Sequence, residues 1–146
     1  MTFWWKKKAM MMLGGTTPPT PSETPITGLT WSVGSFISGT NGQVLSNVAY
    51  GSYSAPFAVS PGQVIKRTGL QSYDDTNINM FVHYYRATPA NQGNWMERGS
   101  NLSVGSTETV PSGAAYARFT FAYGSTSGKT MTQTAIDSAY GAEFVN

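Results

Sequence analysis

The sequence predicts an all-β fold, an antiparallel β-sandwich or jelly roll, and three observations support this prediction. Two stretches, 78–86 and 115–123, alternate with the period of two expected of strands that bury one face. Shorter stretches of similar texture are separated by turn residues. No stretch has an apolar period of 3.6 residues over a useful length. We therefore expect residues 26–146 to form one β-sandwich domain.

The strand over 115–123 is the expected centre of the sheet, because its apolar side chains alternate most regularly. One face is expected in the core and consists of Ala115, Ala117, Phe119, Phe121 and Tyr123; the other consists of Tyr116, Arg118, Thr120 and Ala122. The strand over 78–86 has the same pattern. Its expected core face is Ile78, Met80, Val82 and Tyr84, and its other face is Asn79, Phe81, His83 and Tyr85.

Shorter strands and turns complete the expected domain. The dipeptide Asn41-Gly42 is the strongest hairpin signal in the chain. Pro61 and Gly62 occupy the two central positions of a type II turn. The other expected strands are 29–37 (interrupted at Gly34), 44–48, 53–59 (with Pro56 at an edge or start), 63–68 and 130–136. The other expected loops and turns are 72–77, 88–106 (around a short segment at Trp95-Met96) and 124–128.

Composition limits the partners that the domain is expected to have. Charged residues make up only 11% of the 146 residues, against roughly 25% in an average soluble protein. From Ile26 onward six cationic residues balance six acidic ones, so we expect no basic face for nucleic acid. Because the chain has no cysteine, it can form neither disulfides nor thiolate metal sites, and its redox compartment stays open.

The first 13 residues form an amphiphilic segment that we interpret as an anchor. Aromatic residues precede the lysines, which is the wrong order for a secretory signal, and a transmembrane helix needs about 20 apolar residues. We favour docking onto a protein partner; contact with a membrane surface and a disordered terminus are the alternatives. The expected anchor residues are Phe3, Trp4, Trp5, Lys6, Lys7, Lys8, Met10, Met11, Met12 and Leu13.

Residues 14–25 form the expected linker between this anchor and the domain. The segment contains four prolines and several threonines, which favour an extended, polyproline-like chain. The chain is thus expected to consist of an anchor (1–13), a Pro/Thr-rich spacer (14–25) and the sandwich (26–146).

The candidate contact residues are aromatic and polar side chains on the expected non-core face, together with one tryptophan in a loop. Three uses are open for them: an interface between subunits, which we favour, ordinary packing, and stacking against sugar rings. These residues are Phe81, His83, Tyr85, Trp95, Tyr116 and Arg118.

Catalytic and metal-binding signals are weak. His83 is the only histidine and no nucleophile motif accompanies it, so we expect no enzyme and no cofactor. The stretch from Gly124 to Thr130 resembles a phosphate-binding loop but has three residues between its glycines where four are needed, and we expect a hairpin turn there. Asp74, Asp75 and Asn77 are a weak Ca²⁺ candidate, with a solvated turn as the alternative.

A recurrent order of turn and core residues over 29–123 resembles the small β-sandwich domains of tailed-bacteriophage accessory structural proteins, of decoration, head-fibre, tail-fibre or baseplate type. The residues that carry the resemblance are Trp31, Gly34, Phe36 and Ile37; Ser54, Phe57, Val59, Pro61 and Gly62; Tyr84 and Tyr85; and Thr109, Val110, Pro111, Ala114, Tyr116, Arg118 and Phe119. The resemblance implies a non-enzymatic virion protein that binds other capsid or tail proteins through its N-terminal segment. It also implies a homo-oligomer, for which we favour a trimer. The alternative is a carbohydrate-binding module for host adhesion, with a cell-surface glycan as partner.

Overall fold

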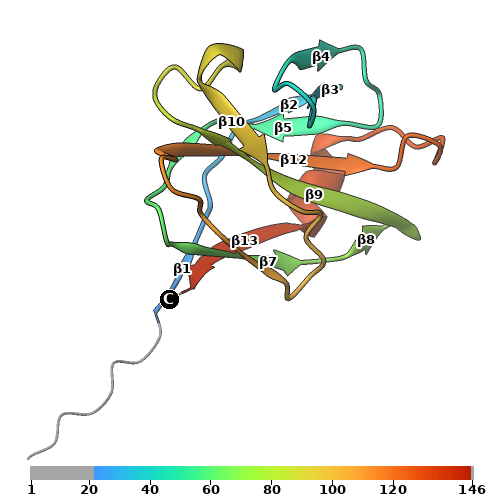
Figure 1. The fold of residues 1–146 in the computed structure, drawn as a ribbon. Helices are drawn as coiled ribbons and strands as arrows, with labels where there is room; N and C mark the ends of the chain where they lie inside the picture. The colour runs from blue at the N-terminus through green and yellow to red at the C-terminus, as the bar shows by residue number, and fades with distance from the viewer. Residues whose placement is uncertain (1–21, 146) are drawn as a thin grey trace, which may run out of the picture.

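Two antiparallel sheets pack face to face in the computed structural model, which describes residues 22–145 (Figure 1). The small sheet has the order β1 (Glu23–Pro25), β13 (Tyr140–Val145), β7 (Val64–Gly69) and β11 (Thr107–Thr109). The large sheet has the order β10 (Trp95–Arg98), β9 (Thr76–Tyr85), β12 (Tyr116–Tyr123), β5 (Ser52–Ser54) and β2 (Trp31–Val33), with β6 (Phe57–Ala58) beside β12 and β8 (Ser72–Tyr73) beside β9. The predicted all-β class is confirmed.

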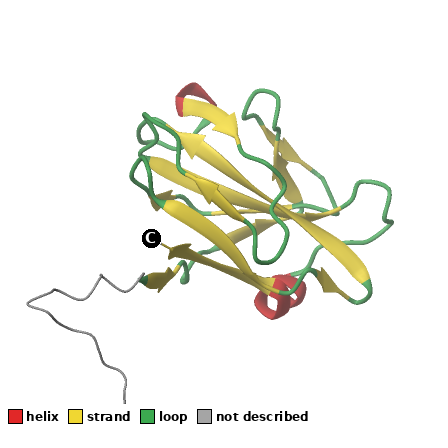
Figure 2. Ribbon diagram, turned by 60° about the horizontal axis from the view of Figure 1, so that its bottom comes forward, coloured by secondary structure: helices red, strands yellow, loops and turns green. Residues whose placement is uncertain are grey.

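A separate hairpin and two helical segments complete the described chain. Strands β3 (Ser35–Ile37) and β4 (Val44–Ser46) pair only with each other and lie beyond the large sheet, on the side away from the small sheet (Figure 1). The short segments η1 (Gln92–Asn94) and α1 (Gln133–Ala139) lie at the periphery of the strands (Figure 2).

The central pair of strands, β9 and β12, confirms the two strongest sequence predictions. The strands pair in register over eight residues, from Tyr116 opposite Tyr85 to Tyr123 opposite Ile78. The predicted core residues on both strands are at most 4% exposed: Ile78, Met80, Val82, Tyr84, Ala117, Phe119, Phe121 and Tyr123. Ala115 precedes the strand and is half-buried. Alternation thus identified the inner face of the large sheet.

Arg67 on β7 is an unexpected member of the core, with 0% of its surface exposed. Its guanidinium donates to the carbonyl oxygens of Ile78 (2.9 Å), Leu102 (2.7 Å) and Leu70 (3.0 Å). Burial lowers the pKa of Arg67. These bonds tie the small sheet to the start of β9 and to the 100–106 loop, since one side chain satisfies three carbonyl groups from separate segments.

The end of the chain differs from the prediction. The predicted strand over 130–136 is wrong, because residues from Gln133 form helix α1. The Thr132 hydroxyl caps the helix by accepting from the Ala135 amide at 3.1 Å, and Ala135, Ile136 and Ala139 are buried. The turn at 124–128 is present, but it leads towards this helix and not into a hairpin strand. The unpredicted strand β13 then takes an interior place in the small sheet.

Two other predicted turns are confirmed, and two other segments differ from the prediction. Gly62 has φ 88° and the Gln63 amide donates to Ser60 at 3.1 Å, as a type II turn requires. The predicted hairpin around 41–42 is confirmed as β3–β4, with residues 38–43 as its connection. The predicted 72–77 loop is a tight hairpin between β8 and β9. The end of the predicted linker, Glu23–Pro25, is strand β1 and pairs with β13.

Candidate functional site

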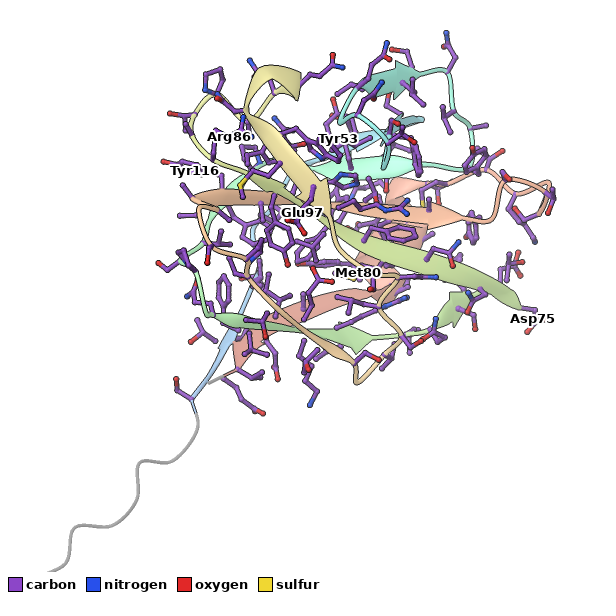
Figure 3. The ribbon with its side chains drawn as sticks, viewed as in Figure 1. Tyr53, Asp75, Met80, Arg86, Glu97 and Tyr116 are labelled. Carbon is purple, nitrogen blue, oxygen red and sulfur yellow. The ribbon has the colours of Figure 1, made fainter. Side chains whose placement is uncertain are left out.

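The outer face of the large sheet, turned away from the small sheet, carries most of the candidate contact residues. Strand register places Arg118 opposite His83 on the neighbouring strand, and Thr120 opposite both Phe81 and Tyr53. Figure 3 shows Met80 between the two sheets and Tyr53 on the other side of the large sheet. We call the following residues the outer-face cluster: Tyr53, Phe81, His83, Trp95, Arg98, Arg118 and Thr120.

Two of the candidate contact residues, His83 and Tyr85, do not lie at the surface of the domain, since they are 0% and 1% exposed. The other candidates, Phe81, Trp95, Tyr116 and Arg118, are half-buried. His83 and Tyr85 are therefore packed beneath other side chains, and the three uses considered for this face stay predictions.

The β3–β4 hairpin covers part of this face. A Cβ added at Gly42 would collide with the Trp95 ring, and one added at Gly39 would collide with the Arg98 guanidinium. Ile37 on the same hairpin is 0% exposed but does not belong to the core between the sheets. Residues 38–43 therefore rest directly on two members of the outer-face cluster.

The protonation state of His83 follows from its contacts. The Trp95 indole Nε1–H donates to His83 Nδ1 at 3.1 Å, so Nδ1 carries no proton. Burial, assisted by the nearby Arg98 charge, lowers the pKa of His83 to about 3. The ring is therefore neutral at pH 7 and carries its proton on Nε2.

Three buried polar atoms of the outer-face cluster have no hydrogen-bond partner among residues 22–145: His83 Nε2, Arg118 Nε and Thr120 Oγ1. The Arg118 guanidinium lies 5.4 Å from the Tyr53 ring centroid and donates to the Ser54 carbonyl at 3.2 Å. The Arg98 guanidinium lies 4.1 Å from the Phe81 ring centroid. Within the described chain the only ion pair joins Lys129 and Asp74, so neither arginine of the cluster is paired with a carboxylate. The cluster is cationic, aromatic and rich in donors.

A second candidate is a cavity of about 440 Å³ at the edge of the sandwich, which we call the edge cleft. Its main polar group is Glu108, whose carboxylate accepts from the Tyr84 hydroxyl and from the Ser100 amide at 3.0 Å. Burial raises the pKa of Glu108, and the Glu97 charge adds to this, while the two hydrogen bonds oppose it. The lining residues are Tyr84, Glu97, Arg98, Gly99, Ser100, Glu108, Thr109 and Pro111.

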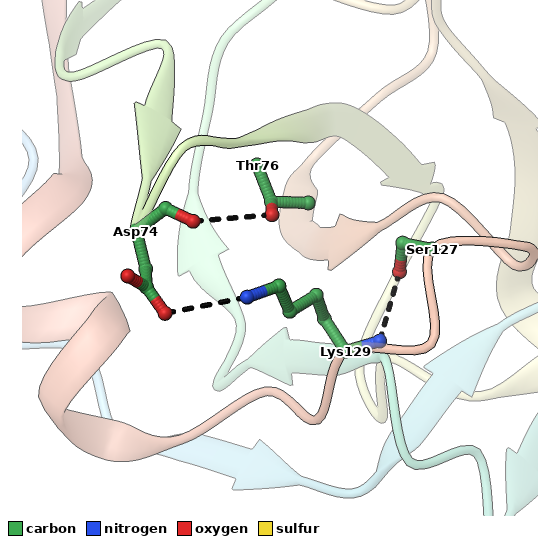
Figure 4. Close-up of polar contacts among 4 residues, drawn as sticks. All are labelled: Asp74, Thr76, Ser127 and Lys129. Carbon is green, nitrogen blue, oxygen red and sulfur yellow. Dashed lines mark hydrogen bonds and ion pairs between the residues drawn. The ribbon is translucent and has the colours of Figure 1, made fainter.

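The weak Ca²⁺ candidate lies at the β8–β9 hairpin tip (Figure 4). Asp74 and Asp75 have φ of 50° and 58°, as in the two central positions of a type I′ turn. The Asp74 carboxylate pairs with Lys129 Nζ at 3.3 Å, and its carbonyl accepts from Thr76 Oγ1 at 3.2 Å. Over residues 22–145 no three His, Cys, Asp or Glu side chains gather as a metal site would require. Turn geometry and an ion pair account for these residues.

The predicted anchor residues, Phe3 to Leu13, lie outside the described residues. In the part that the structure describes, no helix has the length and hydropathy needed to span a membrane. The chain matches no protein-family model, no curated protein and no solved structure.

Sequence reasoning missed several residues that complete these two sites. Thr120 is on the expected non-core face of the 115–123 strand. Its alternation with Tyr116 and Arg118 was the signal by which the sequence could have added it to the cluster. Arg98 and Glu108 lie in stretches without a regular pattern. No local signal therefore indicated that Arg98 would pair with His83 of β9, or that Glu108 would accept a hydrogen bond from Tyr84 of the same strand.

Proposed function

We propose that the protein is a non-enzymatic structural component of a bacteriophage virion, of decoration or fibre type. In this proposal the N-terminal segment binds a capsid or tail protein and the sandwich is displayed from the particle. The observation that carries the proposal is the pairing of β1 with β13, with Glu23 opposite Val145 and Pro25 opposite Glu143. Strand β1, the first described strand, therefore belongs to the small sheet, while the outer face belongs to the other layer (Figure 1). A tether on the small sheet leaves the outer face available.

The order of the strands supports a jelly roll as the architecture of the displayed domain. Along the chain the strands cross repeatedly between the layers: β5 and β6 lie in the large sheet, β7 in the small, β8 to β10 in the large, β11 in the small, β12 in the large and β13 in the small. Such crossing between two sheets is typical of jelly rolls, which are common in viral capsid and lectin domains.

Two local observations support a role without catalysis. The sole histidine is buried, and its Nδ1 is occupied by the Trp95 indole. The Glu108 carboxylate is held by Tyr84 and by the Ser100 amide. Neither group is arranged as a general acid or base facing a substrate.

Self-association remains part of the proposal, with a trimer as the favoured state. Three of the five exposed large apolar side chains of the described residues lie on β2 and on the β3–β4 hairpin: Val33 is 41%, Val44 47% and Leu45 38% exposed, while Leu70 and Val104 lie elsewhere. Apolar residues that remain exposed on a folded domain often mark an interface. Light scattering of the full chain should give a discrete trimer, whereas a clean monomer would mean that any symmetry comes from the particle.

Virion attachment can be tested with a truncated variant whose first residue is chosen from the start of β1. Because β1 begins at Glu23, removing residues 1–21 should leave every described strand intact. We expect this variant to fold, by circular dichroism, and to be absent from purified particles. A matched variant, with Trp4 and Trp5 changed to alanine in the full chain, should also be lost from particles. Normal incorporation of the truncated protein would contradict the proposal.

The second candidate function is carbohydrate binding during host adhesion. The observation that favours it is the half-buried aromatic surface of Phe81, Trp95 and Tyr116 beside the exposed Arg98. A glycan array should show binding that Tyr116→Ala weakens without changing the fold, with the distant Tyr73→Ala as the matched control. A blank array would count against this function and leave the structural role unaffected.

A further inference from the structure

We propose that the outer-face cluster binds the carboxylate of an acidic sugar, beneath the loop of the β3–β4 hairpin. This inference rests on the second candidate function, carbohydrate binding, and adds to it a place and a ligand class. The residues that carry it are His83, Arg118 and Thr120, with aromatic side chains around them.

The unpartnered polar atoms of these three residues belong to one small area of the sheet. Arg118 lies directly opposite His83 in the β9–β12 register, and side chains in such positions have Cβ atoms about 4.5–5.5 Å apart. Thr120 is two residues further along β12, on the same face. Both His83 and Thr120 are 0% exposed. Because buried polar groups in native proteins are almost always satisfied, three such atoms in one place indicate a site for a polar ligand.

The chemistry of these atoms selects an acceptor with a negative charge. His83 Nε2 carries the ring proton, since Nδ1 already accepts from Trp95. Arg118 Nε also donates only, and its guanidinium keeps its charge at all ordinary pH values. A carboxylate accepts hydrogen bonds through both oxygens, and bonds with an ionised partner are about twice as strong as neutral ones. Thr120 can donate to the same group.

The surroundings of the donors select a sugar as the carrier of this carboxylate. Tyr53, Phe81 and Trp95 are half-buried on the same face, and their rings offer apolar surfaces of the kind that stack against sugar rings. Arg98 lies over the Phe81 ring at 4.1 Å and is exposed, so a second guanidinium stands at the rim. Within the described chain neither Arg98 nor Arg118 has an ion-pair partner, and both charges are open to an anionic ligand.

Entry to the site requires movement of residues 38–43, which rest on Trp95 and Arg98. The hairpin shares no ladder with either larger sheet in the described chain, so displacing its tip breaks no strand pairing of the sandwich. Its base is fixed by hydrogen bonds from the Gly34 amide to the Gly51 carbonyl (2.9 Å) and from the Val48 amide to the Gly34 carbonyl (3.0 Å). The base thus stays in place, and only the tip, residues 38–43, has to move.

The experiment is an NMR titration of the full, isotope-labelled chain with sodium glucuronate, N-acetylneuraminate, glucose and inorganic phosphate. We expect the two acidic sugars to shift the Trp95 indole Nε1–H and the Gly39 and Gly42 amides in a saturable way. Glucose and phosphate should bind at least 10-fold more weakly, because glucose lacks the carboxylate and phosphate lacks the sugar ring.

Matched variants test the assignment to individual atoms. Arg118→Lys keeps the charge but removes Nε–H, and Thr120→Val keeps the shape but removes the hydroxyl; each should weaken glucuronate binding at least 10-fold. Arg86→Lys, an exposed arginine whose Nη1 donates to the Gly93 carbonyl, is the control and should leave the affinity unchanged. Superposable amide spectra outside the outer face establish that each variant is folded.

The other outcomes separate the inference from the function on which it rests. Equal binding of glucose and glucuronate would overturn the carboxylate assignment and leave carbohydrate binding standing. Binding of phosphate as tight as that of glucuronate would overturn the sugar assignment. Shifts centred on the edge cleft would overturn the location. If no sugar shifts any resonance and the glycan array is blank, carbohydrate binding and this inference fall together.

Discussion

Both faces of the large sheet contain fully buried side chains, but the two faces are built differently. Phe121 and Thr120 are neighbours on β12, and each is 0% exposed. Phe121 points inward and contacts the rings of Trp31 and Tyr140, with centroid distances of 6.0 and 6.1 Å. Thr120 points outward, and its hydroxyl has no partner among the described residues. Burial therefore marks a core on one face and a candidate site on the other.

The covers of the two faces explain this difference. The small sheet that closes the inner face is held by the β13–β7 ladder, which pairs six residues on each strand. The hairpin beyond the outer face has three residue pairs and its own two-stranded sheet. A thin cover that shares no ladder can be displaced at lower cost than a sheet, so polar groups beneath it remain within reach of a ligand.

The largest expected effect comes from the inner face. Phe121→Ala should lower the free energy of unfolding by about 4 kcal/mol, because it removes a fully buried ring from a packed core. Phe36→Ala, on the hairpin, removes a half-buried ring and should cost less than half as much. Urea denaturation of both variants measures the difference. Equal losses would mean that the hairpin contributes as much to stability as the core.

Acidification should act on the outer face through His83. Its pKa is about 3 in the folded protein and 6.5 ordinarily, so the unfolded chain binds the proton more tightly. The contribution of His83 to stability is therefore complete well above pH 6.5 and is lost as the pH falls towards 3, by up to about 1.4 kcal/mol per pH unit. From pH 6.5 to 5 the expected loss is about 1.6 kcal/mol by urea denaturation. Glu108, whose pKa burial raises above 4.5, acts in the opposite sense as the pH falls towards 4.5.

The control for this titration is His83→Gln, which removes the only histidine of the chain. Its stability should stay nearly constant between pH 6.5 and 5, whatever its absolute value. A parallel decline in the wild type and the variant would show that other groups cause the pH dependence.

The fit of the hairpin on the outer face can be tested with two glycines of nearly equal backbone geometry. Gly42 and Gly128 have φ of 74° and 73°, but only Gly42 has another residue, Trp95, where a Cβ would lie. Both alanine variants carry the same backbone strain. Gly42→Ala should cost a further 1–2 kcal/mol or so from overpacking and should speed solvent exchange of the Trp95 indole proton. Equal costs would contradict a close contact.

The smallest expected effect is at Thr120 itself. Thr120→Val replaces an unpartnered hydroxyl with a methyl group of similar size, so the free energy of unfolding should stay level or rise by about 1 kcal/mol at most. Ser54→Ala is the matched control, because its hydroxyl accepts from the Phe119 amide at 2.9 Å, and it should lose about 1–2 kcal/mol. A large loss from Thr120→Val would mean that the hydroxyl serves the fold.

Local chemistry by itself determined a large part of this protein. Alternation in the sequence identified β9, β12 and the inner face of both strands, because side chains on a strand point to opposite sides in turn. Pro61 and Gly62 identified their turn, because few residues suit its backbone angles. Asn41-Gly42 identified the place of the β3–β4 hairpin, although its connection spans residues 38–43 and only Gly42 of the pair has a positive φ.

Only the tertiary structure decided what lies against each surface. Alternation identified Phe81, His83 and Tyr85 as one face but carried no information about the hairpin and β10, which come from distant parts of the chain. The same holds for Thr130–Ile136, where threonine content favoured a strand but the Thr132 cap and the burial of Ile136 selected a helix. Pattern reports the periodicity of a segment, whereas exposure depends on contacts between segments far apart in sequence.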